Sequence, residues 1–224
     1  MSTSMIMSTS TAFENIRTDF LTQLVATNAG RAHLLSISVE AEEGDEGDIF
    51  GQLEVAVDDR DLARIVARHR DDEARHAQLF RGCLERLGLE LQPVPDELRL
   101  IRHLADATGG FQTAVIETAE DIVATYALLH AIEARGVEQF PRIAEAFAPI
   151  DADTAETYLR VSRDERGHLR YCERIGRHFA PSEVAWQTAL DEARDRETAA
   201  FFAVGLANIE HCTAQGWVHF EVPA

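Results

Sequence analysis

Two five-residue segments carry an acid and a histidine at the same spacing. Asp72–His76 reads Asp-Glu-Ala-Arg-His, and Asp164–His168 reads Asp-Glu-Arg-Gly-His. In an α-helix, residues three apart lie on one face with their side chains about 5–6 Å from each other. Each segment therefore offers a carboxylate and an imidazole to one point in space. Carboxylate-rich sites with few imidazoles suit hard redox ions such as iron and manganese.

The glutamate and the histidine of each segment lie on predicted helix faces that are otherwise apolar. The same holds for Glu133 on a separate helix. The residues that share these faces are Ile65, Phe80, Cys83, Leu87, Tyr126, Leu129, Val137, Phe140, Tyr158, Val161, Leu169, Cys172 and Ile175. Because the apolar stripe of a helix packs against the core, Glu73, His76, Glu133, Glu165 and His168 are predicted to point inward.

A further carboxylate is expected on the helix that precedes Glu73. Glu43 lies thirty residues before Glu73, and Glu133 lies thirty-two residues before its own partner Glu165. Both intervals fit two antiparallel helices joined by a short loop. A weak internal repeat supports the pairing, because a shift of 90 residues aligns Glu43 with Glu133. A shift of 92 residues aligns the two five-residue segments.

Glu43 is preferred over the other acids of its segment, which are Glu40, Glu42 and Glu46. It shares a predicted stripe with Leu35, Val39 and Phe50. Glu40 is the alternative first ligand, although it lies about 60° away from that stripe on a helical wheel. The sequence leaves the choice between these acids open.

Inward-pointing acids create an energetic problem. An isolated carboxylate that moves into a low-dielectric interior costs several kcal/mol even after relaxation, whereas a whole domain is stable by only about 5–15 kcal/mol. A single Glu-x-x-His is most often a solvated helix face. Two such pairs, each with an upstream acid, favour a metal site instead, because two divalent cations balance four carboxylates and two neutral imidazoles.

Composition narrows the class of protein. The chain has 224 residues, 46% of them hydrophobic, which is enough for one sizeable core. Its formal net charge of −18 repels phosphate backbones and gives no attraction to anionic membranes, so neither partner is expected. Three cysteines form no Cys-x-x-Cys. Without a signal-peptide pattern in 1–11 or an apolar run of about 20 residues, a cytoplasmic location is expected.

Apolar residues recur at intervals of three and four, so an all-α fold is predicted. The expected helices are 11–27, 31–57, about 60–87, 96–107, about 111–147, about 153–179, and a helix or helix pair from 182 toward 216. Gly88, Pro93 and Gly109 mark breaks, and Asp153 with Glu156 resembles a capping box. One domain is expected over 1–224, with a flexible tail at 1–10 and its core at 31–88 and 111–180.

The set of Glu43, Glu73 with His76, Glu133, and Glu165 with His168 resembles the ferritin-like di-iron carboxylate superfamily, which includes rubrerythrin-like and di-iron oxygenase-like proteins. The resemblance covers 31–88 and 111–180. It implies an up-down four-helix bundle with extra N-terminal, middle and C-terminal helices. It also implies two iron ions, or manganese ions, bridged by Glu73 and Glu165. Each histidine would bind one ion, and Glu43 and Glu133 would be terminal ligands.

The aspartate before each motif glutamate adds to the resemblance. With Arg75 inside the first copy, the pattern is similar to the oxygen-activating members, including bacterial hydrocarbon monooxygenases. This implies that Asp72 and Asp164 accept hydrogen bonds from ligand histidines and fix their tautomers. His69 and His130 each lie one turn before a predicted ligand and are expected to be core or supporting groups rather than ligands.

The leading hypothesis is a non-haem di-iron or di-manganese oxidoreductase. It would activate oxygen or peroxide to oxidise or hydroxylate a small organic substrate, with the metal centre as the catalytic group and a separate electron donor. The alternatives are a ferroxidase or iron-handling protein, and a structural module without metal. The aromatic residues near the C-terminus are candidates either to cover the bundle or to form a homodimer face; they are Trp186, Phe201, Phe202 and Trp217.

Overall fold

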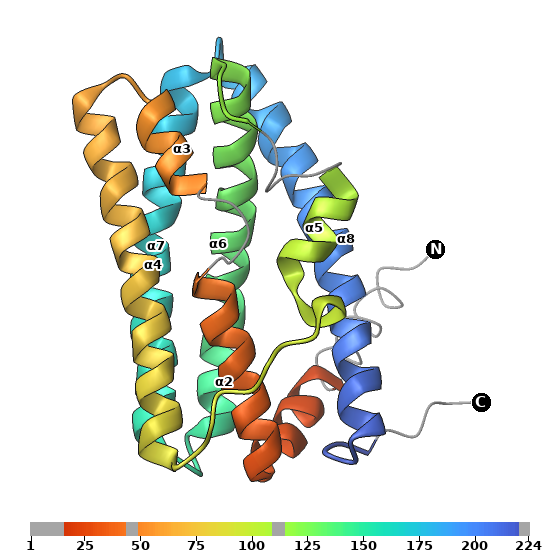
Figure 1. The fold of residues 1–224 in the computed structure, drawn as a ribbon. Helices are drawn as coiled ribbons and strands as arrows, with labels where there is room; N and C mark the ends of the chain where they lie inside the picture. The colour runs from red at the N-terminus through yellow and green to blue at the C-terminus, as the bar shows by residue number, and fades with distance from the viewer. Residues whose placement is uncertain (1–15, 44–48, 109–114, 220–224) are drawn as a thin grey trace, which may run out of the picture.

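The computed structural model describes residues 16–43, 49–108 and 115–219, and every regular element in these ranges is helical (Figure 1). Residues 16–26 are helical. The elements that follow are α2 (Asn28–Glu43), α3 (Ile49–Ala56), α4 (Arg60–Leu87), the 3₁₀ helix η1 (Asp96–Leu98), α5 (Leu100–Thr108), α6 (Ala119–Phe147), α7 (Ala152–Phe179) and α8 (Glu183–Ala214). The predicted all-α class is confirmed for these residues. None of their helices is long and apolar enough to cross a bilayer.

The helices that carry the predicted site residues lie side by side. Helix α6 packs along α7, and α4 packs against both α2 and α7. Helix α3 also contacts α4, and Figure 1 shows α2 and α3 following one another along that helix. Helices α5 and α8 contact each other, and α8 covers α6. The predicted helix over 31–57 is therefore two helices, with 44–48 outside the described residues.

Helix α4 begins and ends where its sequence predicts. The carboxylate of Asp59 accepts hydrogen bonds from the backbone N–H groups of Asp61 and Leu62, both at 2.9 Å. Gly88 ends the helix in the left-handed conformation, with φ of 65°, which costs glycine nothing because it has no Cβ. These two caps fix the length of the helix that carries Glu73 and His76.

The start of α6 differs from the prediction. The helix begins at Ala119 rather than near 111, because Thr118 and Asp121 form a capping box there. Residues 109–114, which include the predicted Gly109-Gly110 break, lie outside the described residues. Residues 115–117 are not helical.

The start of α7 also differs. Its N-cap is Asp151, whose side chain accepts from the N–H of Thr154, in place of the predicted pair of Asp153 and Glu156. Asp151 stands immediately before the first helical residue, which is the position from which a side chain can reach the third N–H. The predicted helix over 96–107 divides into η1 and α5, and the C-terminal region forms the single helix α8.

The buried apolar residues form two clusters at opposite ends of the long helices. We call one of them the upper cluster because it lies at the start of α4, toward the top of Figure 1. It includes Leu53, Tyr126 and Trp186. The lower cluster includes Phe80 and Tyr158. The predicted metal ligands of α4, α6 and α7 lie between these clusters along each helix. The fold therefore places its acids and histidines in the middle of the core, with an apolar region on either side.

The contact between Gly176 and Trp186 gives a test of this packing. A Cβ at Gly176 would lie 2.2 Å from Cζ3 of Trp186, whose side chain is fully buried. We expect Gly176→Ala to lower the free energy of unfolding by about 1–3 kcal/mol through overpacking. Gly82→Ala is the control, because its Cβ meets nothing within 4 Å, and it should stabilise α4 by up to ~1 kcal/mol. Urea unfolding measures the change in the free energy of unfolding for both variants. Equal changes would contradict the close contact between Gly176 and Trp186.

Candidate metal centre

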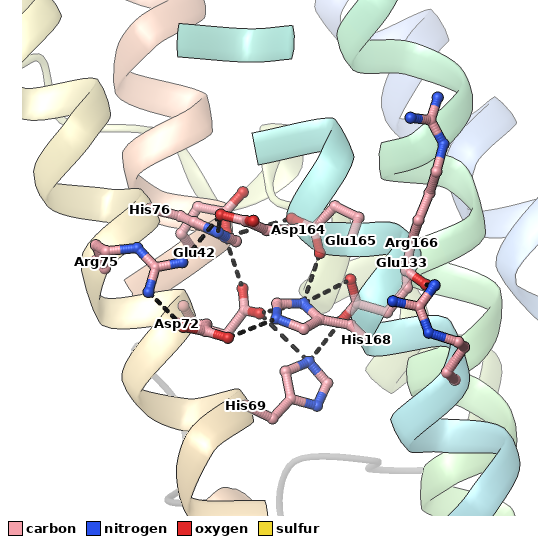
Figure 2. Close-up of polar contacts among 12 residues, drawn as sticks. Glu42, His69, Asp72, Arg75, His76, Glu133, Asp164, Glu165, Arg166 and His168 are labelled. Carbon is pink, nitrogen blue, oxygen red and sulfur yellow. Dashed lines mark hydrogen bonds and ion pairs between the residues drawn. The ribbon is translucent and has the colours of Figure 1, made fainter. Parts of the chain in front are cut away.

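Four carboxylates and three imidazoles meet between the two apolar clusters. Figure 2 shows the polar contacts among them. This polar belt comprises Glu42 of α2, His69, Glu73 and His76 of α4, Glu133 of α6, and Glu165 and His168 of α7. The side chains fall into two groups of four that share Glu73. Within each group, one potential ligand atom per residue lies within 4.8 Å of the others. We call the group of His69, Glu73, Glu133 and His168 position A, and the group of Glu42, Glu73, His76 and Glu165 position B.

The polar belt is buried. The three histidines and Glu165 are at most 2% exposed, and Glu133 is 7% exposed. The side chain of Glu42 is 6% exposed and that of Glu73 is 16% exposed. Because buried carboxylates need compensating charge or strong hydrogen bonds, the groups that face them decide whether the site can exist.

At position A, two histidines from different helices meet the same carboxylates. Nδ1 of His168 lies 2.7 Å from Oε2 of Glu165 and 2.9 Å from Oε1 of Glu73. Its distance to Oε2 of Glu133 is 3.5 Å. Nε2 of His69 lies 2.9 Å from Oε1 of Glu133. The nitrogen of each ring that faces the carboxylates is the one available to a cation at this position.

At position B, a single imidazole faces three carboxylates. Nδ1 of His76 lies 3.2 Å from Oε2 of Glu42 and 3.3 Å from Oε1 of Glu165. Its distance to Oε2 of Glu73 is 3.9 Å. Glu165 thus approaches His76 with one oxygen and His168 with the other, so it lies between the two positions.

The aspartate of each motif lies behind the histidine of the other motif. Oδ2 of Asp164 is 3.4 Å from Nε2 of His76, and Oδ2 of Asp72 is 3.5 Å from Nε2 of His168. The guanidinium of Arg75 donates to both aspartates, with its Nη2 at 2.9 Å from Oδ2 of Asp164. An Nε2–H directed at a carboxylate leaves the Nδ1 lone pair free for a metal ion. In the structure, each aspartate therefore lies close to the Nε2 atom of the histidine in the other motif.

Glu43, the predicted first ligand, is not part of the polar belt. Its carboxylate is held by Arg81, whose Nη2 lies 2.6 Å from Oε2, and its side chain is 40% exposed. Glu40, the alternative, faces Arg99 at 3.5 Å. The neighbouring Glu42 occupies the place instead. One residue of shift turns a side chain by about 100° around the helix, so the choice between adjacent acids decides which reaches the site.

The structure has Glu42 rather than Glu43 at the site because α2 ends at Glu43, before the last residue of the predicted stripe. The predicted stripe relied partly on Phe50, which belongs to the separate helix α3 and gives no register for α2. The two stripe residues that do lie on α2 are Leu35 and Val39, and both are buried. They stand seven and three residues before Glu42, which is also helical spacing to one face.

His69 is a member of position A, although the sequence prediction assigned it to the core or to a supporting role. The available signal was its position four residues before Glu73, on the same face of α4. His130 lies three residues before Glu133 on α6 but remains outside both positions. Its Nε2 lies 3.8 Å from Oε1 of Glu173 instead.

Close packing of acids and imidazoles shifts their proton affinities. Burial, together with the charge of Glu133, raises the pKa of Glu165 to about 8. Burial opposes the charged form of His76, but its hydrogen bonds to Glu165 and Glu42 outweigh burial and raise its pKa to about 10. Burial likewise opposes ionisation of Glu73, yet hydrogen bonds with His168 and His69 hold its pKa at about 2. Without metal, protons on Glu165 and His76 therefore offset part of the negative charge of the belt at neutral pH, and a bound cation would replace them.

The donor set fits two divalent cations. Four carboxylates carry the charge that two such ions balance, and oxygen donors with a few imidazoles suit iron or manganese. No cysteine belongs to either position among the described residues. The side chains converge from α2, α4, α6 and α7, so ions at these positions would connect all four helices.

Comparisons with protein-family models, with characterised proteins and with solved structures give no match to this chain. The helical fold and the buried His/Glu groups fit a di-iron bundle loosely. The likeness to the ferritin-like superfamily therefore rests on these residues and their geometry.

The neighbouring acids at the end of α2 provide a matched test of the ligand set. We expect Glu42→Gln to lower the affinity of position B for Mn²⁺ at least about tenfold, because even groups behind metal ligands contribute about 10–100-fold. Glu43→Gln, which loses only its surface pair with Arg81, should bind as the unaltered protein does. Isothermal titration of metal-free protein measures both, and equal affinities for the two variants would contradict the assignment of Glu42.

The shifted pKa values predict how the metal-free protein responds to pH. The folded state retains protons on Glu165 up to about pH 8 and on His76 up to about pH 10, above their ordinary values. The folded chain then binds more protons than the unfolded chain, so its free energy of unfolding should fall as pH rises from about 5 to about 10. Denaturant unfolding in the presence of a chelator measures this dependence. Glu165→Gln should make the free energy of unfolding less dependent on pH. A free energy of unfolding that rises over this pH range would contradict the raised pKa values of Glu165 and His76.

Proposed function

We propose that this chain is a non-haem dinuclear metal protein with the four-helix bundle of the ferritin-like superfamily, formed by α2 with α3, α4, α6 and α7. The observation that carries the proposal is the pair of buried four-residue groups that share Glu73. Two ions, iron or manganese, would be held at positions A and B.

The contacts suggest how the residues divide the work of binding. Glu73 belongs to both positions, and Glu165 lies between His76 and His168, so these two acids would bridge the ions. Glu133 would complete position A, and Glu42 would complete position B. This retains the bridging pair that the resemblance implies, replaces the terminal ligand of the first helix, and adds His69 to position A.

We propose an oxidoreductase activity for this site. When bound, a pair of iron ions supplies redox chemistry with dioxygen or peroxide. The chain's own residues support that use. Asp72 and Asp164 hold the Nε2 protons of the histidines, so the imidazoles keep one tautomer and one orientation. The apolar clusters above and below the polar belt exclude water, which strengthens every electrostatic interaction inside it.

The substrate proposed here is a small organic molecule with apolar character. Aromatic rings border the polar belt: Phe50 lies 4.8 Å from the ring of His69, and Tyr171 lies 5.8 Å from that of His168. An apolar molecule would contact such rings favourably, and the acidic surface would disfavour a phosphorylated one. A separate electron donor would return the ions to their reduced state.

Anaerobic loading with iron followed by exposure to oxygen tests the activity. Protein that holds two Fe²⁺ per chain should consume oxygen or peroxide within seconds and show a new absorption from oxidised iron. Glu133→Ala should reduce the initial rate at least about tenfold, in line with the loss of a ligand, whereas the surface variant Glu43→Gln should leave it unchanged. Oxygen uptake and absorption are recorded together.

The outcomes of this experiment separate the candidate functions. Failure of the unaltered protein to bind metal would overturn the dinuclear site itself. Binding without any reaction with oxygen or peroxide would overturn the oxidoreductase and leave a metal-binding role. Continued oxidation of iron far beyond two ions per chain, together with a large hollow assembly on a sizing column, would instead identify an iron-handling protein.

A further inference from the structure

The two positions of the polar belt are chemically different. Position A combines two imidazoles, from His69 and His168, with the carboxylates of Glu73 and Glu133. Position B combines one imidazole with three carboxylates. Figure 2 shows that the rings of His69 and His168 both contact the carboxylate of Glu133. The second imidazole of position A, which position B lacks, is that of His69.

The surroundings of His69 favour a ligand over an ordinary core histidine. The side chain is 0% exposed, and its Nε2 lies 2.9 Å from Glu133 and 3.3 Å from Glu73. Its ring packs 4.8 Å from Phe50 and 4.1 Å from His168, measured between centroids. Its Nδ1 is buried and has no hydrogen-bond partner among the described residues. Within the described part of the chain, the polar contacts of this ring are thus with the carboxylates of position A.

The internal repeat shows that this imidazole is present in one half of the chain only. The shift of 92 residues that aligns Glu73 with Glu165 places Val161 opposite His69. Val161 is fully buried in the lower apolar cluster. The equivalent place on α7 therefore holds an aliphatic side chain, and the helical fold alone does not require a histidine there.

We propose that His69 binds the ion at position A and makes the two positions select different metals. The inference rests on the proposed dinuclear site. Imidazole nitrogens favour later transition ions such as Zn²⁺ and Co²⁺, whereas carboxylate oxygens suit Mn²⁺. Position A then takes the later ion and position B takes the harder one. Supplied with both, the chain assembles a mixed-metal centre in preference to pairs of one metal.

Electron paramagnetic resonance distinguishes these arrangements in the unaltered protein. Metal-free protein receives one equivalent each of Zn²⁺ and Mn²⁺. The expected spectrum is that of isolated Mn²⁺, since Zn²⁺ is diamagnetic and occupies position A. X-ray absorption at the zinc edge should show two imidazole ligands. A spectrum of exchange-coupled Mn²⁺ pairs, or zinc with one imidazole, would overturn the inference without any variant.

A matched pair of variants tests the part played by His69. In His69→Gln, we expect the affinity of position A for Zn²⁺ to fall at least about tenfold. The affinity of the protein for Mn²⁺ should change by less than about twofold. The mixed-metal preference should disappear, and coupled Mn²⁺ pairs should appear in the spectrum. His130→Gln is the control, because that histidine is also buried one turn before a glutamate but contacts Glu173 outside both positions. It should behave as the unaltered protein.

The results separate this inference from the function on which it rests. Absence of any metal binding by the unaltered protein would overturn both. The inference alone would be overturned if the protein binds two ions with the same metal preference at both positions and His69→Gln binds Zn²⁺ as tightly as the unaltered protein. Circular dichroism of each metal-free variant establishes that it is folded, and the zinc-edge measurement on the unaltered protein decides the question if a variant does not fold.

Discussion

The constraint on which this molecule depends is the burial of four carboxylates in the middle of a helical core. They lie between two apolar clusters, and none of them is more than 16% exposed at the side chain. A buried charge without a partner costs several kcal/mol, which no domain tolerates four times over. The histidines resolve part of the conflict by holding protons, because the acids raise the pKa of His76 to about 10. Divalent cations would reduce this cost further, since each divalent cation balances the negative charges of two carboxylates.

The crossing of the two motifs makes the arrangement cooperative. Each aspartate supports the histidine of the other helix, and Arg75 joins both aspartates on the outer side of the belt. Neither α4 nor α7 can turn without moving a group that orients the other helix's histidine. Caps at the start and end of α4 fix its register independently of these contacts. The helices therefore place the proposed ligands, and the contacts of the histidines with Asp72 and Asp164 fix the orientation of the rings.

Much of this arrangement was accessible from the sequence, for reasons that also explain the failures. The motif around Glu73 and His76 could be placed because both residues lie on one continuous helix, where spacing defines a face. Glu42 could not be distinguished from Glu43, since the register ran through residues on both sides of the end of α2. The start of α6 was misplaced because apolar residues continue before Thr118, and only the capping contacts stop the helix.

His69 was assigned to the core or to a supporting role for a different reason, and the reason bears on what the site does. The prediction of ligands used the symmetry of the two halves, and His69 has no counterpart in the second half. A buried ring with an unpartnered nitrogen costs about 1–3 kcal/mol, and Val161 shows that the matching place on α7 accepts an aliphatic residue without that cost. Repetition explains why two positions exist. The departure from repetition, at one histidine, is what gives those positions different chemistry.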